Sequence, residues 1–535
     1  MRSISACTLK HSQKRSPLRR LVCLALCVLL CAPLSALASN VDTELSVGII
    51  STKTTEIRPL APLERDVSSL YALVYEGLIT INDDYRPQAL LCEYWEESGN
   101  GKTWTFHLRS GITFSDGTPM TARDVVATAQ FILDQANNEE NTDKGYYGNL
   151  RFFVDSITAQ DDMTVVVKAT RDRPYYGLLY AMTFPILPAD RVGEADPPGT
   201  GPFVISDFMP QDYMWLTVNT KWWKQAPKVQ QIMATCYRNN QEIIDSYEYA
   251  QVDAVFTRSV AAAQYKSGTT SLRLDYRSRQ LETLLMNHSS FPLGSQKIRQ
   301  AIRYAINVDQ IATQVYLNMV SRTDTPIIGG TWLYSDTSGA YGYNLDKAKA
   351  LLAEEGWKDL DGNGTLDKAV EAGKEPKHLV LGLHVYEDSD NGVRVAAAYM
   401  IKDMLAQVGI SVHVEQGSFS DVTTALSAGS FDLALASYQM DAVPDPGFML
   451  TSGNTGNYSR YKNTEMNDLV KTLRAQENPE DFAKTLADIQ QLFAQDVPFI
   501  CLFYRNGSVL THKMYTTARD VRELELLRGI ESFAQ

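Results

Sequence analysis

Two carboxylates in the stretch SYQMDAVPDPGF, residues 437–448, are well placed to bind a charged ligand. Asp441 and Asp445 follow an apolar run, and Pro444 and Pro446 stiffen the loop that holds them. A carboxylate that is shielded from water forms charge-assisted hydrogen bonds, each of which contributes about 1.5 to 3 kcal/mol. Alternatively, Asp441 caps the proline-rich turn through its own backbone, and the residues alone favour this structural role.

The stretch DLDGNGTLD, residues 359–367, has the acidic and glycine spacing of a calcium-binding loop. Its candidate ligands are the side chains of Asp359, Asp361 and Asn363 and the carbonyl oxygen of Thr365. Gly364 stands at the sharp turn, but Val370 occupies the twelfth position, where such a loop needs a bidentate glutamate. We therefore predict a simple turn and no cofactor, with weak calcium binding as the alternative.

No combination of residues in the sequence has the spacing of a catalytic site. The tripeptide 101–103 matches the end of a phosphate-binding loop, but Glu96 replaces its first glycine, and residues 103–108 alternate like a strand. The motifs Gly-x-Ser-x-Gly and His-Glu-x-x-His are absent. Ser459 and Lys462 fit Ser-x-x-Lys without the companion motifs of penicillin-binding enzymes. We predict that the protein is not an enzyme, and a secreted hydrolase is the alternative from another class.

Residues 1–38 have the parts of a cleaved export signal. Six basic residues and no acidic one precede an apolar run that begins at Leu21, and Ala36 and Ala38 are small residues at the −3 and −1 positions of a cleavage site. The run is shorter than the roughly 20 residues that span a bilayer. We predict cleavage after Ala38 and export to the periplasm or the outer face of the cytoplasmic membrane. A lipid anchor at Cys31 is the alternative that we do not favour.

Loss of that segment makes the chain more acidic. Its six basic residues leave with it, so the formal net charge changes from −13 to −19. Such a charge argues against nucleic acid and against an anionic membrane surface as partners. Cys92, Cys236 and Cys501 remain, without the spacing of a zinc site; we predict buried free thiols, with one disulfide as the alternative. The rest of the 535-residue chain exceeds a single core, so we expect at least two lobes.

The segments before the acidic loop predict a parallel α/β unit. A helix over 395–408 leads into a strand over 410–415, and a helix over 421–428 leads into a strand over 431–437. Strand, helix and strand in this order favour parallel strands, and ligands in such sheets bind beyond the carboxyl ends of the strands. We therefore expect a binding site in the loop that follows the last strand.

Three earlier segments have clear periodicity. We predict an opening strand over 45–51 and a strand over 103–108 with its apolar side chains on one face. A helix over 125–133 follows Thr121 and Asp124, which have the spacing of a capping box.

With these segments in order, the chain resembles the family-5 extracellular solute-binding proteins, the receptor subunits of peptide-type ABC importers. The stretches that carry the resemblance are VYEGL (74–78), TWTFHLRSGITFSDGTPMTARDVV (103–126), PPGTGPFVISDF (197–208), KIRQAIRYAINVDQI (297–311), NLDKAKALLAEEGW (344–357) and PDP (444–446). Together they cover nearly the whole chain after the export signal.

The resemblance implies an α/β fold in the form of a two-lobed periplasmic-binding-protein clamp (type II, peptide-binding class) with an additional smaller α+β domain. The first lobe is expected to be discontinuous and to comprise residues 39–81, 184–285 and 500–535. The small domain is expected over residues 82–183, and the second lobe over residues 286–499. Ligand is enclosed between lobes that close by a hinge.

The resemblance also implies roles for individual residues. In peptide-binding members, an aspartate three residues after an aromatic residue anchors the ligand's ammonium group, which assigns this role to Asp441 after Tyr438. The loop is one residue longer than usual, so Asp445 is expected to share or displace that role. Dipeptide binders hold the ligand carboxylate with an arginine; Arg394 is the nearest cation here, and we interpret it as a solvated residue at a helix start. The pair Trp222–Trp223 matches an aromatic pair of the family, which we expect in the core.

The implied function is capture of short peptides and their delivery to permease and ATPase subunits on other chains. The peptide backbone is expected to bind by added-strand pairing, and its side chains to lie in watery pockets. We expect a monomer. A metal chelate, an oligosaccharide or an opine is the alternative cargo, and a peptide-signalling role would use the same site.

Overall fold

A computed structural model describes residues 43–61, 64–98, 101–140, 145–170, 176–336, 342–369, 374–387, 392–512 and 521–530. Residues Glu44–Gln535 belong to one compact unit. The predicted export signal, with its cut after Ala38, lies outside the described residues. In the part of the chain that is described, no helix has both the length and the apolar character needed to cross a membrane.

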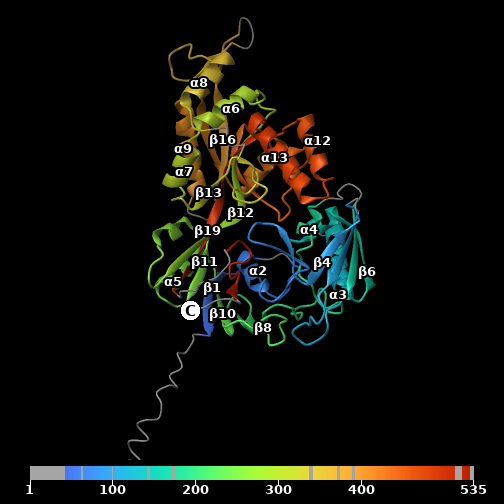
Figure 1. The fold of residues 1–535 in the computed structure, drawn as a ribbon. Helices are drawn as coiled ribbons and strands as arrows, with labels where there is room; N and C mark the ends of the chain where they lie inside the picture. The colour runs from blue at the N-terminus through green and yellow to red at the C-terminus, as the bar shows by residue number, and fades with distance from the viewer. Residues whose placement is uncertain are drawn as a thin grey trace, which may run out of the picture. The chain divides into compact units, whose positions relative to one another are not determined.

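One large mixed sheet runs through this unit, with β12 and β19 in its middle (Figure 1). The strands lie in the order β17–β16–β18–β12–β19–β11–β1–β10–β9–β8, and β13 pairs with β19 at the side. Their bounds are β1 (Glu44–Ile50), β8 (Phe203–Met209), β9 (Tyr213–Val218), β10 (Gln231–Tyr237), β11 (Ala254–Thr257), β12 (Leu272–Met286), β13 (Val320–Arg322), β16 (Val380–Tyr386), β17 (Ser411–Gly417), β18 (Leu433–Gln439) and β19 (Phe499–Thr511).

The two long strands β12 and β19 connect the two halves of the sheet. They pair with each other in antiparallel fashion, with an irregularity between Arg277 and Leu281. Residues 280–286 of β12 also pair with β18, whereas residues 508–511 of β19 pair with β11. The large sheet continues past residues 285 and 499 without a break. The lobe boundaries predicted there therefore stay predictions.

The first half of the sheet contains the predicted opening strand. β1 pairs in parallel with β10 and β11, and its side chains Leu45, Val47 and Ile49 are buried in one apolar cluster. Helices α2 (Arg65–Tyr71) and α5 (Asn240–Glu248) pack against this strand. The prediction for residues 45–51 is therefore confirmed to within a residue at each end.

The second half contains the predicted parallel unit. β16 pairs in parallel with both β17 and β18, with α9 (Val393–Ala406) and α10 (Phe419–Ala428) as the connecting helices. Alternating burial in β17 and continuous burial in β18 match their positions at the edge and in the interior of the sheet. All four predicted segments are confirmed, with no end shifted by more than two residues.

A separate four-stranded antiparallel sheet lies within residues 92–169, in the order β4–β5–β7–β6. Its strands are β4 (Cys92–Glu97), β5 (Thr103–Leu108), β6 (Val154–Asp161) and β7 (Thr164–Ala169). β5 has the predicted bounds, and its apolar side chains Trp104, Phe106 and Leu108 are buried on one face. Helix α3 (Ala122–Asn137) packs on this sheet and begins with the predicted capping box of Thr121 and Asp124.

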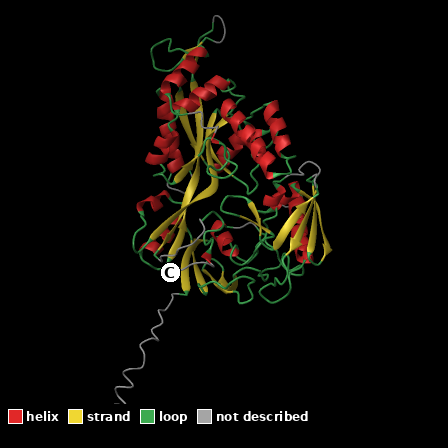
Figure 2. Cartoon of the chain, in the orientation of Figure 1, coloured by secondary structure: helices red, strands yellow, loops and turns green. Residues whose placement is uncertain are grey.

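The remaining elements cover the sheets or connect them (Figure 2). They are β2 (Ile79–Ile81), β3 (Pro87–Ala89), η1 (Gly148–Phe152), α4 (Leu178–Ala181), η2 (Val260–Gln264), α6 (Gln296–Ala305), α7 (Val308–Gln314), α8 (Leu345–Glu354), β14 (Asp367–Lys368), β15 (Lys377–His378), α11 (Gly447–Leu450), α12 (Thr464–Leu473) and α13 (Pro479–Asp496). Cys92 and Cys501 are buried free thiols, as predicted, and Cys236 is a half-buried one.

Candidate ligand-binding site

A cavity of about 540 Å³ lies among segments from both halves of the large sheet and from the small domain. Its wall includes residues of α2, of the β2–β3 hairpin and of the C-terminal segment 524–529. Tyr146, Arg279 and Ala442 complete it from three other parts of the chain. This volume is within the range of small-molecule sites, which is roughly 300 to 1,000 Å³.

Glu76 and the tryptophan pair form one side of the cavity. The Trp223 indole N–H donates to Glu76 Oε2 at 2.8 Å, and Lys224 Nζ lies 3.7 Å from Glu76 Oε1. Burial raises the pKa of Glu76 above its ordinary value, although Lys224 and the indole N–H groups favour the charged form. Trp222 is buried, as predicted, but both tryptophans also line the cavity, a role that the prediction of core packing missed.

Two of the signature stretches meet directly behind this wall. The backbone N–H of Gly201 donates to the Val74 carbonyl at 2.9 Å. A Cβ atom on Gly199 would lie 2.0 Å from the same carbonyl oxygen, so no other residue fits there. The stretches 74–78 and 197–208 therefore hold Glu76 in place through close backbone contact.

Asp441 lies next to the cavity wall. Its Oδ2 accepts a hydrogen bond from the amide of Asn149 in η1, and its Oδ1 accepts one from the backbone N–H of Ala442 at 2.6 Å. Ala442 itself lines the cavity. The carboxylate thus makes a local backbone bond, as the structural alternative requires, and also contacts the small domain. Its role as an ammonium anchor stays a prediction.

Asp445 and Tyr438 shape the loop that carries Asp441. The Arg474 guanidinium binds Asp445, with Nε···Oδ2 at 2.7 Å, and Gly447 N–H donates to Asp445 Oδ1 at 2.8 Å. Tyr438 is buried among aromatic rings, and its hydroxyl donates to the Gly456 carbonyl at 2.8 Å. Neither side chain is among those that line the cavity. Their predicted ligand roles are untested, and the contacts they make are structural.

Arg394 is not a solvated residue, so that interpretation is wrong. Its side chain is 1% exposed and forms a two-point ion pair with Glu282 of β12, at 2.8 and 3.1 Å. Its guanidinium also lies over the Tyr386 ring. The partner comes from a strand 112 positions earlier, which nothing in the local sequence indicates.

Arg279 is a cavity residue that the sequence did not single out. Its guanidinium donates to the Tyr146 hydroxyl, and its carbonyl accepts a hydrogen bond from Met440 N–H at 2.8 Å. The β12–β18 pairing that ends here places Arg279 beside the loop of Asp441. Because this proximity depends on strand pairing, no local pattern could have predicted it.

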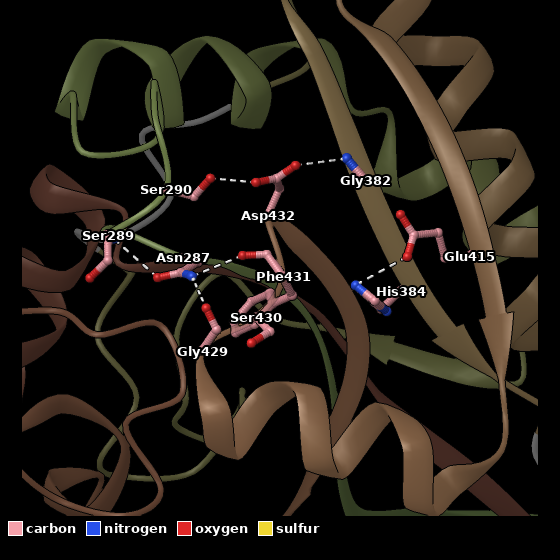
Figure 3. A pocket seen from close by; sticks show the side chains of 10 residues that line it. All are labelled: Asn287, Ser289, Ser290, Gly382, His384, Glu415, Gly429, Ser430, Phe431 and Asp432. Atoms are coloured by element: carbon pink, nitrogen blue, oxygen red, sulfur yellow. Dashed lines mark hydrogen bonds and ion pairs between the residues drawn. The ribbon is translucent and has the colours of Figure 1, made fainter.

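A second pocket, of about 520 Å³, lies at the end of β18 away from the acidic loop (Figure 3). Asp432 accepts hydrogen bonds from Gly382 N–H at 2.9 Å and from the Ser290 hydroxyl. The Asn287 amide donates to the carbonyls of Gly429 and Phe431. These groups join strand ends and a turn to one another, and His384 Nε2 lies 3.4 Å from Glu415 Oε2 in the same lining.

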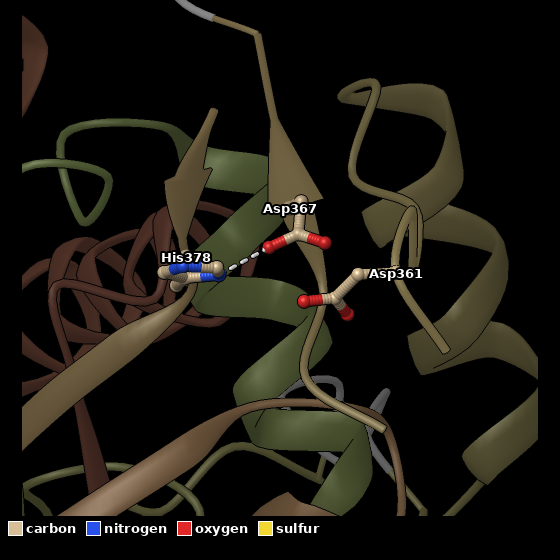
Figure 4. A group of neighbouring side chains, drawn as sticks. All are labelled: Asp361, Asp367 and His378. Atoms are coloured by element: carbon tan, nitrogen blue, oxygen red, sulfur yellow. Dashed lines mark hydrogen bonds and ion pairs between the residues drawn. The ribbon is translucent and has the colours of Figure 1, made fainter. Parts of the chain in front are cut away.

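The candidate calcium loop is a turn bonded to itself. Asp359 accepts from the N–H groups of Gly362 and Gly364, at 2.8 and 3.0 Å, and Asn363 Oδ1 accepts from Thr365 N–H. Asp361, Asp367 and His378 gather at its base, with potential ligand atoms within 4.8 Å of one another (Figure 4). The bonds within the loop use oxygens that a calcium ion would need.

Comparison with known proteins identifies the family. Residues 86–460 match the bacterial extracellular solute-binding proteins, family 5 Middle. The chain therefore belongs to this family, as the resemblance implied. Oligopeptide-binding protein AppA of Bacillus subtilis is 24% identical over 85% of this chain and 86% of its own length. Heme-binding protein A of Haemophilus influenzae is also 24% identical, over 78% of this chain and 79% of its own length.

Solved structures share the fold. AppA from Bacillus subtilis in complex with a nonapeptide aligns with a TM-score of 0.67 at 21% identity, over 92% of this chain and 99% of that one. NikZ from Campylobacter jejuni in complex with Ni(L-His) aligns with a TM-score of 0.71 at 18% identity, over the same shares. The predicted α/β clamp of the family-5 binding proteins is thus confirmed, and the chain is a solute-binding protein.

Proposed function

We propose that this chain is the extracytoplasmic substrate-binding subunit of an ABC importer and that it captures short peptides in the 540 Å³ cavity. The observation that carries the proposal is the meeting of three chain regions around this cavity, with the acidic loop at its edge. Opening of the lobes admits the ligand, and closure shields it from water. The peptide leaves unchanged, because the site only binds.

Contacts between the small domain and residues at the cavity support a closing motion that depends on the bound ligand. Asn149 contacts Asp441, and Tyr146 contacts Arg279, so two neighbouring side chains of this domain bind two residues at the cavity. Trp332 also donates to the Tyr85 carbonyl at 3.2 Å, which joins the domain to the second lobe. A ligand ammonium group at Asp441 would replace the Asn149 amide as the donor.

The transport partners follow from the family. Solute-binding proteins need permease and ATPase subunits, and we propose that this chain delivers its peptide to such subunits as a monomer. Export with cleavage after Ala38 would bring it to the required side of the membrane. We propose no calcium requirement for this function, since the loop at residues 359–367 is not among the segments that line the cavity.

Native mass spectrometry of the mature protein, purified from its host, tests the proposal. We expect adducts whose masses, after release, correspond to intact short peptides. Incubation of the protein with added peptides should return them uncleaved. Adducts of a metal chelate, a sugar or an opine would contradict the peptide assignment and would support the alternative cargo, and cleavage products would contradict the receptor function itself.

A further inference from the structure

The charged side chains that line the cavity are not balanced. They are the carboxylates of Glu76 and Glu525 and the cationic groups of Arg109, Lys224, Arg279 and Arg528. The wall therefore has an excess of two positive charges, although the whole chain has a formal net charge of −13. This excess of positive charge gives the cavity a positive electrostatic potential, opposite in sign to the net charge of the chain.

Two of these cations have carboxylate partners within the wall. Lys224 Nζ lies 3.7 Å from Glu76, and Arg528 Nε lies 3.2 Å from Glu525. Arg109 and Arg279 make no ion pair with a carboxylate within 4.0 Å among the described residues. Among the lining side chains, the excess charge is therefore on these two guanidinium groups, and the carboxylates of Asp441 and Glu523, outside the lining, attract Arg279.

Neutral contacts fix the direction of both groups. Arg109 donates through Nε to the Leu90 carbonyl at 2.7 Å, and its guanidinium lies 5.6 Å from the centre of the Trp223 ring. Arg279 donates through Nη1 to the Tyr146 hydroxyl. Each guanidinium has further N–H groups in a planar fork that matches a carboxylate. The two side chains are therefore oriented in advance for an anion.

Arg279 stays charged in this position. Burial opposes its charged form, but attraction from Tyr146, Glu523 and Asp441 outweighs burial and raises the pKa of Arg279 above its ordinary value. Glu523 itself is engaged elsewhere, since it accepts from the Arg279 backbone N–H and lies 3.6 Å from Arg258. Its direct hydrogen-bond partner, the Tyr146 hydroxyl, is a neutral group, so a ligand carboxylate would add a charge-assisted hydrogen bond that this contact does not supply.

We propose that the cavity selects ligands with net negative charge, whose carboxylates bind Arg279 and Arg109. The inference rests on the proposed function in one respect: if the cargo is peptide, the preferred peptides carry an acidic side chain in addition to the C-terminal carboxylate. The two arginines are then specificity residues for an acidic peptide.

The test compares two pools of synthetic tri- and tetrapeptides. The peptides of one pool contain glutamate, and those of the other have glutamine at the same position and are otherwise identical. Binding is measured by native mass spectrometry and by titration calorimetry of single peptides from each pool. The wild type should bind the glutamate peptides at least tenfold more tightly. R279Q and R109Q should each reduce this preference by about tenfold. R238Q, at an exposed arginine outside the cavity wall, is the matched control and should change nothing.

The outcomes separate the inference from the proposed function. Equal binding of the two pools by the wild type overturns the charge selection and leaves the peptide receptor intact. If neither pool binds, the peptide function fails. The charge selection is then tested by the rise in melting temperature that citrate produces, compared with the rise that its uncharged triamide produces. Equal rises overturn the inference. R279K, which keeps the charge, should retain more of the preference than R279Q. If R279Q folds poorly, R279K and R109Q still test the inference, because R279K should keep most of the preference for glutamate peptides and R109Q should lose it.

Discussion

Arg394 and Glu282 form an ion pair in the interior of the second half of the sheet. The shorter of their two contacts joins Nη2 to Oε1 at 2.8 Å, and each side chain is 1% exposed. Arg505 lies 4.0 Å from the same carboxylate. The pair fixes helix α9 to strand β12 and makes Arg394 unavailable for a ligand carboxylate.

E282Q should lower the free energy of unfolding by about 3 to 5 kcal/mol, because it removes the charge of the buried carboxylate that Arg394 binds at two points. Urea unfolding followed by circular dichroism measures the change. E354Q is the matched control, since Glu354 pairs with Lys297 on the surface, where both side chains are about half exposed. Such a pair contributes less than about 1 kcal/mol. Similar small losses in both variants would contradict the structural role of the buried pair.

D441N should weaken the binding of peptides with a free amino group by about tenfold or more, because the amide lacks the charge that favours an ammonium group. N-acetylated peptides should bind the wild type and the variant equally. Titration calorimetry with both forms of one peptide distinguishes these cases.

D468N is the control for that substitution, since Asp468 is exposed on helix α12 and does not line the cavity. Unchanged affinity of D441N for the free peptide would mean that Asp441 only caps its turn. In that case its contacts with Ala442 and Asn149 are its whole role.

Sequence periodicity predicted the elements on which the site is built. The strand at 103–108 and the four segments between residues 395 and 437 were predictable because their apolar residues alternate or run continuously along the chain. The acidic loop follows the last of these strands, so its place near a site was predictable as well.

Contacts between distant segments were not predictable in the same way. Arg394 binds Glu282, 112 positions away, and Arg279 reaches the cavity through the end of the β12–β18 pairing. Trp223 faces the cavity because Glu76 accepts its indole N–H from a segment 147 positions earlier. A single sequence contains no signal for such distant pairs. The adjacent residues Trp222, Trp223 and Lys224 are different, because a lysine next to two tryptophans indicates locally that a cation can pack on an aromatic ring.

Glu64 provides a prediction for the pH dependence of stability. Burial opposes its ionisation, but hydrogen bonds from the backbone and hydroxyl groups of residues 51–54 outweigh burial and lower the pKa of Glu64 to about 2. A lowered pKa in the folded state adds stability above the ordinary value of 4.5, and this stability is lost as the pH falls toward 2.

The melting temperature of E64Q should therefore lie below that of the wild type at pH 7, and the difference should shrink as the pH falls from about 4.5 to 2. Differential scanning fluorimetry across this range measures it. E93Q, at an exposed glutamate of β4, should show no such trend. A difference that grows toward low pH would have the wrong sign for a carboxylate held in its charged form.

Calcium should not stabilise the turn at residues 359–367. Because Asp359 and Asn363 already accept backbone N–H groups, the turn is held together without an ion. We expect the melting temperature to change by less than about 1 °C between millimolar calcium and a chelator. A larger rise in calcium that D361N abolishes would contradict this interpretation and would support an ion held by Asp361 and Asp367.

Trp223 should report ligand binding by its fluorescence. Its ring is half-buried in the cavity wall, with Lys224 Nζ 4.4 Å from the ring centre and its indole N–H on Glu76. A ligand that displaces water from this wall changes the surroundings of the indole, so binding should shift the emission of the wild type. W223F should lose most of that shift, whereas W357F, in the core of the second half, should keep it. An unchanged shift in W223F would place the ligand away from this wall.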